Sequence, residues 1–587
     1  MTKHTPDYLR ARASNLSLRS AALASSSASL AAPVAAMPSP SAAARAQPAK
    51  AVSDEARYLI AGDLMNEVAR RALRACIRCA VQLPYGVDHI VQAPECPVCA
   101  VRDCRPEVFT KPFCDFLTGS PTVFHAVDYF KAKLDEAGYK ELPARDDWTG
   151  KVKAGGQYYV TRNGSSLIAF AVGQAYKPGN GVAMIAGHID ALTARLKPVS
   201  SKPNKAGYVQ LGVAPYAGSL NQTWWDRDLS IGGRVVVRDE ETGKTAVRLV
   251  KVDWPIARVP TLAPHFGVGM MGTGNKETQA VPIIGLDNSD LFSAPGAAAG
   301  ADETKPYLGG GPAGSFAASQ PPKLVKLITS QLGLKSAASI VNWELELFDI
   351  QPAAVGGLDK EFIFAGRIDD KLCSWAAFEA LLCATDHQDE GVVKLVALFD
   401  DEEIGSLLRQ GAKGNFLPSV VERAVEALCG SSTTTTTTTT PFGPGVVGRT
   451  YASSFLVSAD VTHAVHPNFL SSYLDGHAPR LNVGVAVCAD SNGHMTTDSV
   501  STAILDRVAE LSGCVNQTFM IRNDSRSGGT VGPSLSSAMG VRSADAGLPQ
   551  LSMHSIRATT GALDPGLGVK FFKAFLDKFE KVDAEWH

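Results

Sequence analysis

The sequence predicts an α/β domain built on a buried, largely parallel sheet. The strongest indication is Val392–Phe399, a mostly apolar run rich in Val and Leu that is followed by four consecutive carboxylates, Asp400–Glu403. Such runs are typical of strands buried on both faces of a parallel sheet. A second indication is Lys371–Ala384, where apolar residues recur near helical spacing after another short apolar run. Ligands gather at the carboxyl ends of parallel strands, so we expect the acids to lie at a functional edge.

The four acids would be costly to bury together, because adjacent carboxylates repel one another and lose solvation. A fold tolerates them when a cation offsets the charge or when one of them holds a proton. A divalent metal is therefore the first hypothesis for Asp400–Glu403. The alternative is a solvated acidic turn that leads into a helix after Gly405.

Four further apolar runs also end in residues that bind metals. They are VAMIAGHID with His188 and Asp190, FIFAGRIDD with Asp369 and Asp370, SSFLVSAD with Asp460, and LPQLSMHSIR with His554. A lone His or Asp at a strand end is more often satisfied by its neighbours than bound to metal. Together these residues predict a nitrogen and oxygen site for two zinc-like ions, which is typical of hydrolases. One carboxylate must then stay unligated to accept a proton.

These residues and several longer motifs resemble the M18 aspartyl aminopeptidases, co-catalytic zinc exopeptidases. The motifs are SPTVFHAVDYFKAKLDEAGY (120–139), VGQAYKPGNG (172–181), TWWDRDLSIGGRV (223–235), FDDEEIGS (399–406), SADVTHAVHPN (458–468), IRNDSRSGGTVGP (521–533) and LPQLSMHSIR (548–557). The resemblance spans about residues 108–579, with the motifs in the family's order. It implies removal of N-terminal Asp or Glu from peptides.

The resemblance also implies a role for each ligand-type residue. It assigns His188 and Asp460 to one zinc, Glu403 and His554 to a second, Asp369 to both, Glu402 to the general base, and Asp190 to orienting a histidine ligand. Two Zn²⁺ per subunit are expected, one of them exchangeable for another divalent metal. The sequence alone does not show which of Glu402 and Glu403 is the base and which is the ligand. It indicates only that two adjacent acids with different roles need two different environments.

The fold implied by the resemblance is a mixed-sheet exopeptidase domain with helices on both faces, interrupted by a β-rich dimerisation domain. We expect catalytic segments at 108–194 and 356–587 and the dimerisation domain at 195–355, where β-rich runs occur. His265 matches a histidine that reaches into a neighbouring subunit's active site; the alternative is an ordinary loop histidine. The resemblance implies a homo-oligomer, a tetrahedral dodecamer built from dimers.

Residues 1–107 lie outside the resemblance. Residues 1–53 are rich in Ala and Ser and poor in acids, which predicts a disordered tail or, alternatively, an organellar transit peptide. In 54–107, the pairs Cys76-x2-Cys79 and Cys96-x2-Cys99 have the spacing of a structural zinc site. The alternative is that these are small buried cysteines, the first two on a helix.

Composition narrows the function classes. The formal net charge is −2, and the charges are mixed, which argues against nucleic acid as a partner. No apolar run reaches the length of a membrane helix, so we expect a soluble protein. The remaining cysteines are scattered, as in proteins of a reducing compartment, and a cytoplasmic location is expected.

Substrate choice is where the sequence departs from the family. Asn492 stands where a Lys that recognises the acidic substrate side chain is expected, and Ala558 follows Arg557 where the family usually has Glu. Asn492 and the cations His494, Arg522 and Arg557 are candidate substrate-binding residues. Alternatives to the acidic preference are an aminopeptidase of broader specificity and, from another class, an assembly or cargo protein with a vestigial site.

Overall fold

The computed structural model describes residues 105–239, 241–288, 314–384, 389–430 and 440–586, all within one compact unit, Ala72–His587. The expectations for the N-terminal tail and for Cys76, Cys79, Cys96 and Cys99 therefore lie outside the described residues. None of the described helices combines the length and the apolar character that crossing a membrane requires.

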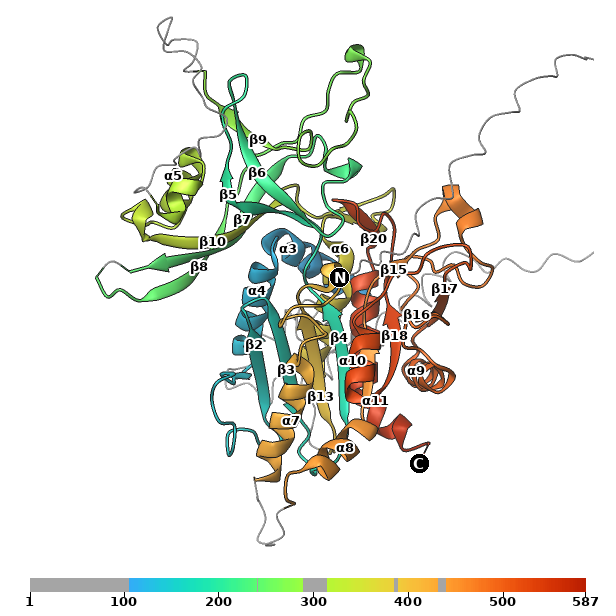
Figure 1. The fold of residues 1–587 in the computed structure, drawn as a ribbon. Coiled ribbons are helices and arrows are strands. Elements are labelled where there is room, and N and C mark those ends of the chain that lie inside the picture. The colour runs from blue at the N-terminus through green and yellow to red at the C-terminus, as the bar shows by residue number, and fades with distance from the viewer. Residues whose placement is uncertain (1–104, 240, 289–313, 385–388, 431–439, 587) are drawn as a thin grey trace, which may run out of the picture. The chain divides into compact units, whose positions relative to one another are not determined.

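A nine-stranded mixed sheet forms the centre of the fold (Figure 1). In spatial order its strands are β1 (Lys140–Glu141), β2 (Gln157–Arg162), β3 (Ser166–Val172), β13 (Val393–Phe399), β4 (Val182–His188), β14 (Phe455–Ser458), β18 (Arg542–Gly547), β16 (Ala486–Ala489) and β17 (Gln517–Met520). The strands β13, β4, β14 and β18 run parallel to one another. Their carboxyl ends therefore meet at one edge.

Helices cover both faces of this sheet, as predicted. One face carries α3 (Thr110–Gly119), α4 (Val123–Glu136), α6 (Ile368–Cys383), α9 (Ser499–Ser512) and α11 (Asp564–Asp583), and the other carries α7 (Phe416–Cys429), α8 (Pro444–Ala452) and α10 (Gly532–Met539). Along β13, Val396 and Leu398 face the first group, whereas Leu395 and Ala397 face the second. Because both faces are buried, the strand has no polar alternation, and this explains its apolar run.

A second, six-stranded sheet lies above the first in Figure 1. Its strands in order are β8 (Thr245–Lys251), β7 (Leu229–Arg238), β10 (Ile340–Asp349), β5 (Thr193–Ser201), β6 (Tyr208–Tyr216) and β9 (Ile283–Leu286). Helix α5 (Pro322–Gln331) packs on it around a separate core that includes Trp224 and Trp343. These strands come from residues 193–349, so the chain leaves the central sheet after β4 and later returns to it.

The remaining elements are short strands and 3-10 helices. The short strands are β11 (Ala354–Gly356), β12 (Phe362–Ala365), β15 (Thr462–His463), β19 (Pro549–Gln550) and β20 (Ala558–Gly561). The 3-10 helices are η2 (Pro106–Phe109), η3 (Gln222–Trp224), η4 (Pro264–Phe266), η6 (Phe316–Ser319), η7 (Ala337–Ser339), η8 (Glu402–Ile404) and η9 (Pro467–Ser472). Of these, η8 follows β13 directly and carries the last two acids of the consecutive four.

Candidate metal centre

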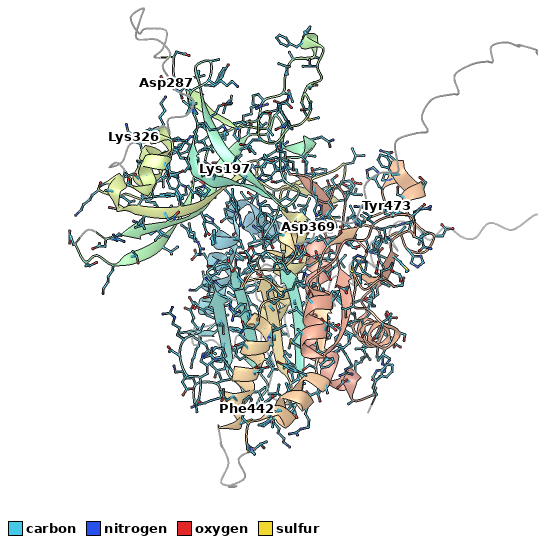
Figure 2. All side chains as sticks on the ribbon, viewed as in Figure 1. Lys197, Asp287, Lys326, Asp369, Phe442 and Tyr473 are labelled. Atoms are coloured by element: carbon cyan, nitrogen blue, oxygen red, sulfur yellow. The ribbon has the colours of Figure 1, made fainter. Side chains whose placement is uncertain are left out.

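Five ligand-type side chains meet at the carboxyl edge of the central sheet. His188 ends β4, which lies between β13 and β14, and Glu403 and Asp460 follow these two neighbouring strands. Asp369 comes from the start of α6, and His554 from the loop after β19. Figure 2 places Asp369 where the central sheet meets the six-stranded sheet. Residues far apart in sequence converge because parallel strands deliver their ends to the same place.

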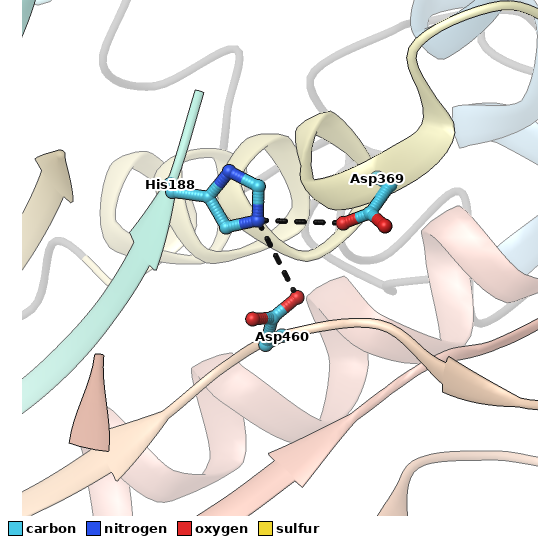
Figure 3. Close-up of side chains that lie close together, drawn as sticks. All are labelled: His188, Asp369 and Asp460. Carbon is cyan, nitrogen blue, oxygen red and sulfur yellow. Dashed lines mark ion pairs between the residues drawn. The ribbon is translucent and has the colours of Figure 1, made fainter. Parts of the chain in front are cut away.

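These side chains form two groups of three that share Asp369. The first is His188, Asp369 and Asp460: Nε2 of His188 lies 3.3 Å from Oδ1 of Asp369 and 3.6 Å from Oδ1 of Asp460 (Figure 3). In the second, Nε2 of His554 lies 3.5 Å from Oδ2 of Asp369 and 3.5 Å from Oε2 of Glu403. Each oxygen of Asp369 therefore faces a different histidine.

The donor sets fit divalent zinc. Zinc binds nitrogen and oxygen at about 2.0–2.2 Å, so neighbouring atoms of a tetrahedral site lie about 3.3–3.6 Å apart, close to the separations seen here. Oε1 of Glu403 is buried and has no hydrogen-bond partner among the described residues, as expected for an oxygen that faces a cation. His554 is half exposed and lies at the mouth of the site, whereas His188 is fully buried.

Glu402 belongs to neither group of three. Its Oε2 lies 3.8 Å from Nε2 of His188, so the carboxylate is near the first group without completing it. Burial raises the pKa of Glu402 to about 8, and the nearby carboxylates of Asp460, Asp190 and Asp369 act in the same direction against the opposing charge of His188. Glu402 and Glu403 therefore have different surroundings in the structure, a difference that their adjacent positions in the sequence do not reveal.

Asp190 holds both sides of this centre in place. Its Oδ1 lies 3.2 Å from Nδ1 of His188 and accepts the backbone N–H of Glu402, and its Oδ2 accepts the N–H of Glu403. Burial raises the pKa of Asp190, but the hydrogen bond and charge of His188 outweigh this and keep the pKa below its usual value. Asp190 is therefore an ionised acceptor that fixes which nitrogen of His188 faces Asp369 and Asp460.

The six-stranded sheet contributes to the same arrangement through residues that the sequence did not indicate. Tyr216, at the end of β6, donates its hydroxyl to Oδ2 of Asp190 at 2.6 Å. Asn221 donates to the backbone carbonyl of His554 at 3.0 Å and so supports a backbone with a φ of +62°. Neither residue belongs to an apolar run that ends in a ligand, and only the fold brings them here.

A cavity of about 400 Å³ opens next to the two groups. Its lining includes the apolar residues Val461, Met495, Phe519, Ile521 and Met553. Polar residues of the lining include Ser406, Lys413, His463 and Thr530. Burial lowers the pKa of His463, so this imidazole is neutral at neutral pH.

The predicted substrate-binding residues do not line this cavity. Asn492, His494 and Arg522 surround a different pocket of about 270 Å³, where Arg522 pairs with Asp524. Arg557 donates hydrogen bonds to the backbone carbonyls of Gln351, Pro352 and Phe364, so its side chain links separate backbone segments. His265 lies exposed in η4 and does not line the cavity of its own chain.

The comparisons with known proteins agree with this architecture. A family model described as Aminopeptidase I zinc metalloprotease (M18) matches residues 116–576. Vacuolar aminopeptidase 1 of Saccharomyces cerevisiae is 41% identical over 485 residues, which are 82% of this chain and 90% of that protein. An aspartyl aminopeptidase of Aspergillus oryzae is 40% identical over 485 residues, 80% of this chain and 96% of that protein.

Two solved structures show the same fold. The mApe1 structure of Chaetomium thermophilum has a TM-score of 0.75 and 68% sequence identity, and covers 82% of this chain and 100% of that chain. A mApe1 dodecamer of Saccharomyces cerevisiae has a TM-score of 0.69 and 38% identity, and covers 82% and 99%. Family match, relatives and fold agree, and the chain therefore belongs to the M18 family of zinc metalloproteases and is a metallo-aminopeptidase.

Proposed function

We propose that this chain uses two zinc ions to remove the first residue of peptides. The observation that carries the proposal is Asp369, whose two oxygens face two separate groups of ligand atoms, with Glu402 beside them and outside both. His188, Asp369 and Asp460 would hold one ion, and Asp369, Glu403 and His554 the other. When bound, such ions polarise the scissile carbonyl and lower the pKa of a water molecule.

The proton transfers are assigned to Glu402. A general base must be able to take a proton, and Glu402 lies next to the first group without belonging to either group, so its carboxylate is not committed to holding an ion. Glu402 takes a proton from the attacking water and then gives it to the nitrogen of the departing peptide. Asp190 supports both steps because it holds the backbone N–H of Glu402 and the ring of His188.

The apolar residues of the cavity lining, Val461, Met495, Phe519, Ile521 and Met553, favour a first residue with a neutral, apolar side chain. An acidic side chain placed against them would lose its hydration, and the imidazole of His463 nearby is neutral, which leaves Lys413 as the one cation of the described lining. The second candidate is the acidic preference predicted from the resemblance. The name of the relative from Aspergillus oryzae, aspartyl aminopeptidase, supports this second candidate.

Specificity constants distinguish the two candidates. With zinc loading matched, kcat/KM for Leu- and Met-led peptides should exceed that for Asp- and Glu-led peptides by about tenfold or more. Asp or Glu ahead of Leu would support the second candidate instead. Absence of hydrolysis with full metal content would favour a vestigial site.

We also propose that the chain assembles as a tetrahedral dodecamer and that His265 completes a neighbour's site. The segment around η4 carries the exposed side chains of Leu262, Phe266, Val268 and Met270, the kind of apolar surface that subunit contacts bury. His265 lies among them. The relative of known structure from Saccharomyces cerevisiae is a dodecamer.

A further inference from the structure

We propose that Lys413 binds a carboxylate on the second residue of the substrate, the part that departs. The inference rests on the proposed aminopeptidase function and adds a preference on the leaving side of the scissile bond. The carboxylate has two sources, the C-terminus of a dipeptide or an acidic side chain in second position. Both present the same charge to an ammonium group.

Lys413 lines the cavity beside the metal centre, together with Glu402, Gly405 and Ser406. It is the only Lys or Arg among the described residues of this lining. The described part of the chain offers its ammonium no hydrogen bond or ion pair. The side chain of Lys413 is exposed, so its ammonium is available to a ligand that enters the cavity.

The loop that carries Lys413 is closely packed. Its backbone N–H donates to the carbonyl of Ser406 at 3.1 Å, and the N–H of Ser406 donates to Asp401 at 2.7 Å. A Cβ on Gly411 would lie 2.8 Å from the backbone of Ser406, and one on Gly414 would lie 2.8 Å from a neighbouring carbonyl. The glycines allow this close approach, so the backbone of Lys413 is fixed relative to the turn that bears Glu402.

The chemistry of Glu402 decides which part of the substrate Lys413 meets. Glu402 must reach the departing nitrogen to return its proton, within about 2.6–3.2 Å. Glu402, Gly405, Ser406 and Lys413 all line the cavity, and the backbone N–H of Lys413 donates to the carbonyl of Ser406. The departing residue, which must lie beside Glu402, is therefore placed toward this part of the lining. The apolar lining residues come from other segments, since Val461 follows the ligand Asp460 and Phe519 lies in β17, and they are left for the first side chain.

Substrates that differ only in a carboxylate test the proposal. The first pair is Leu-Ala with a free C-terminus and Leu-Ala amide; the second is Leu-Asp-Ala amide and Leu-Asn-Ala amide. The wild type should favour the charged member of at least one pair by about five- to tenfold in kcat/KM, in the range of a charge-assisted contact in a solvated cleft. The pair that responds identifies the source of the carboxylate.

Variants then assign the preference to the ammonium group. Lys413→Met should bring the ratio close to one, Lys413→Arg should retain most of it, and added salt should reduce it in the wild type. Lys177→Met is the matched control, because Lys177 is exposed in the loop before β4, at the end of that strand opposite His188. This control should keep the wild-type ratio.

Two results would overturn the role of Lys413. One is a wild type that cleaves both members of each pair equally. The other is a Lys413→Met variant that keeps the wild-type ratio. Failure to hydrolyse any of the four peptides would contradict the proposed function and the role of Lys413 with it.

Discussion

Asp190 lies 3.2 Å from Nδ1 of His188, on the side of the ring opposite the nitrogen that faces Asp369. The same carboxylate accepts the backbone N–H groups of Glu402 and Glu403. The buried side chain of Asp190 therefore positions His188 of the first ligand group. It also positions the turn that carries Glu403 of the second group and the proposed base, Glu402.

Asp190→Asn should weaken zinc binding without unfolding the domain. The amide has the same shape, but it lacks the negative charge that holds the proton on Nδ1 of His188 and leaves Nε2 free to bind zinc. We therefore expect a loss of about 10- to 100-fold in affinity for one zinc ion. Competition titration with a zinc-binding dye measures this loss. Tyr216→Phe, which removes only the hydroxyl bonded to Asp190, is the milder control. Wild-type zinc affinity in Asp190→Asn would contradict the positioning role.

The metal-free protein should become less stable relative to the zinc-loaded protein as pH rises. Burial raises the pKa of Glu402 to about 8 and that of Glu403 to about 10 in the absence of metal. A raised carboxylate pKa stabilises the folded state at low pH, and this contribution is lost as pH rises through the folded-state value. Zinc needs the ionised form of its ligand Glu403, and its charge favours the ionised form of the neighbouring Glu402, so zinc binding releases protons and strengthens with pH.

Thermal unfolding between pH 6 and 9 measures this dependence. The difference in Tm between the zinc-loaded and metal-free proteins should widen with pH. Glu403→Gln removes one of the titrating groups and should flatten the trend in the metal-free protein. A difference that stays constant or narrows would show that the two carboxylates are already ionised without metal.

Co-expression tests whether His265 acts in a neighbouring subunit. His265→Phe and Glu402→Gln should each be nearly inactive alone. In mixed oligomers, a His265→Phe subunit has its own Glu402 and receives His265 from a Glu402→Gln neighbour, so about a quarter of the sites should be intact after random assembly. Tagged subunits purified together allow the specific activity to be compared with both parents.

The control for this experiment is a mixture of Glu402→Gln and Glu403→Gln. Both residues belong to one chain's site, so these variants should not restore each other. No recovery in the His265→Phe mixture would place His265 in its own chain's site or outside any site. Recovery in the control would show that mixing restores activity without any residue having to cross between subunits as proposed for His265.

The residues of the two groups stand out in the sequence because each follows an apolar run. A strand buried on both faces leaves a strong pattern, and a polar residue at its end stands out, as His188 and Asp460 do after β4 and β14. The helical spacing of apolar residues in Lys371–Ala384 corresponds to α6 in the same way, and Phe572, Phe575 and Phe579 of α11 show such spacing too, with all three buried. These features depend on local spacing and burial alone.

The other features of the site depend on long-range packing, which local sequence patterns do not show. Tyr216 and Lys413 carry no local pattern, and they reach the site only because the inserted sheet and the loop after η8 fold against it. Asn492 and Arg557 remain predictions as substrate-binding residues, whereas Met495 and its apolar neighbours line the cavity. The separate surroundings of Glu402 and Glu403 likewise come from side-chain directions that adjacent positions do not encode.

Metal content and turnover of two adjacent variants test the central claim most directly. Glu402→Gln should keep two zinc ions per chain and lose about 10²- to 10⁴-fold in kcat, because it removes the proton acceptor and leaves both ligand groups intact. Glu403→Gln should instead lose one ion. Elemental analysis after gel filtration, combined with a peptide assay, measures both. Loss of zinc from Glu402→Gln, or wild-type turnover by it, would contradict the assignment of Glu402 as the base and of Glu403 as the ligand.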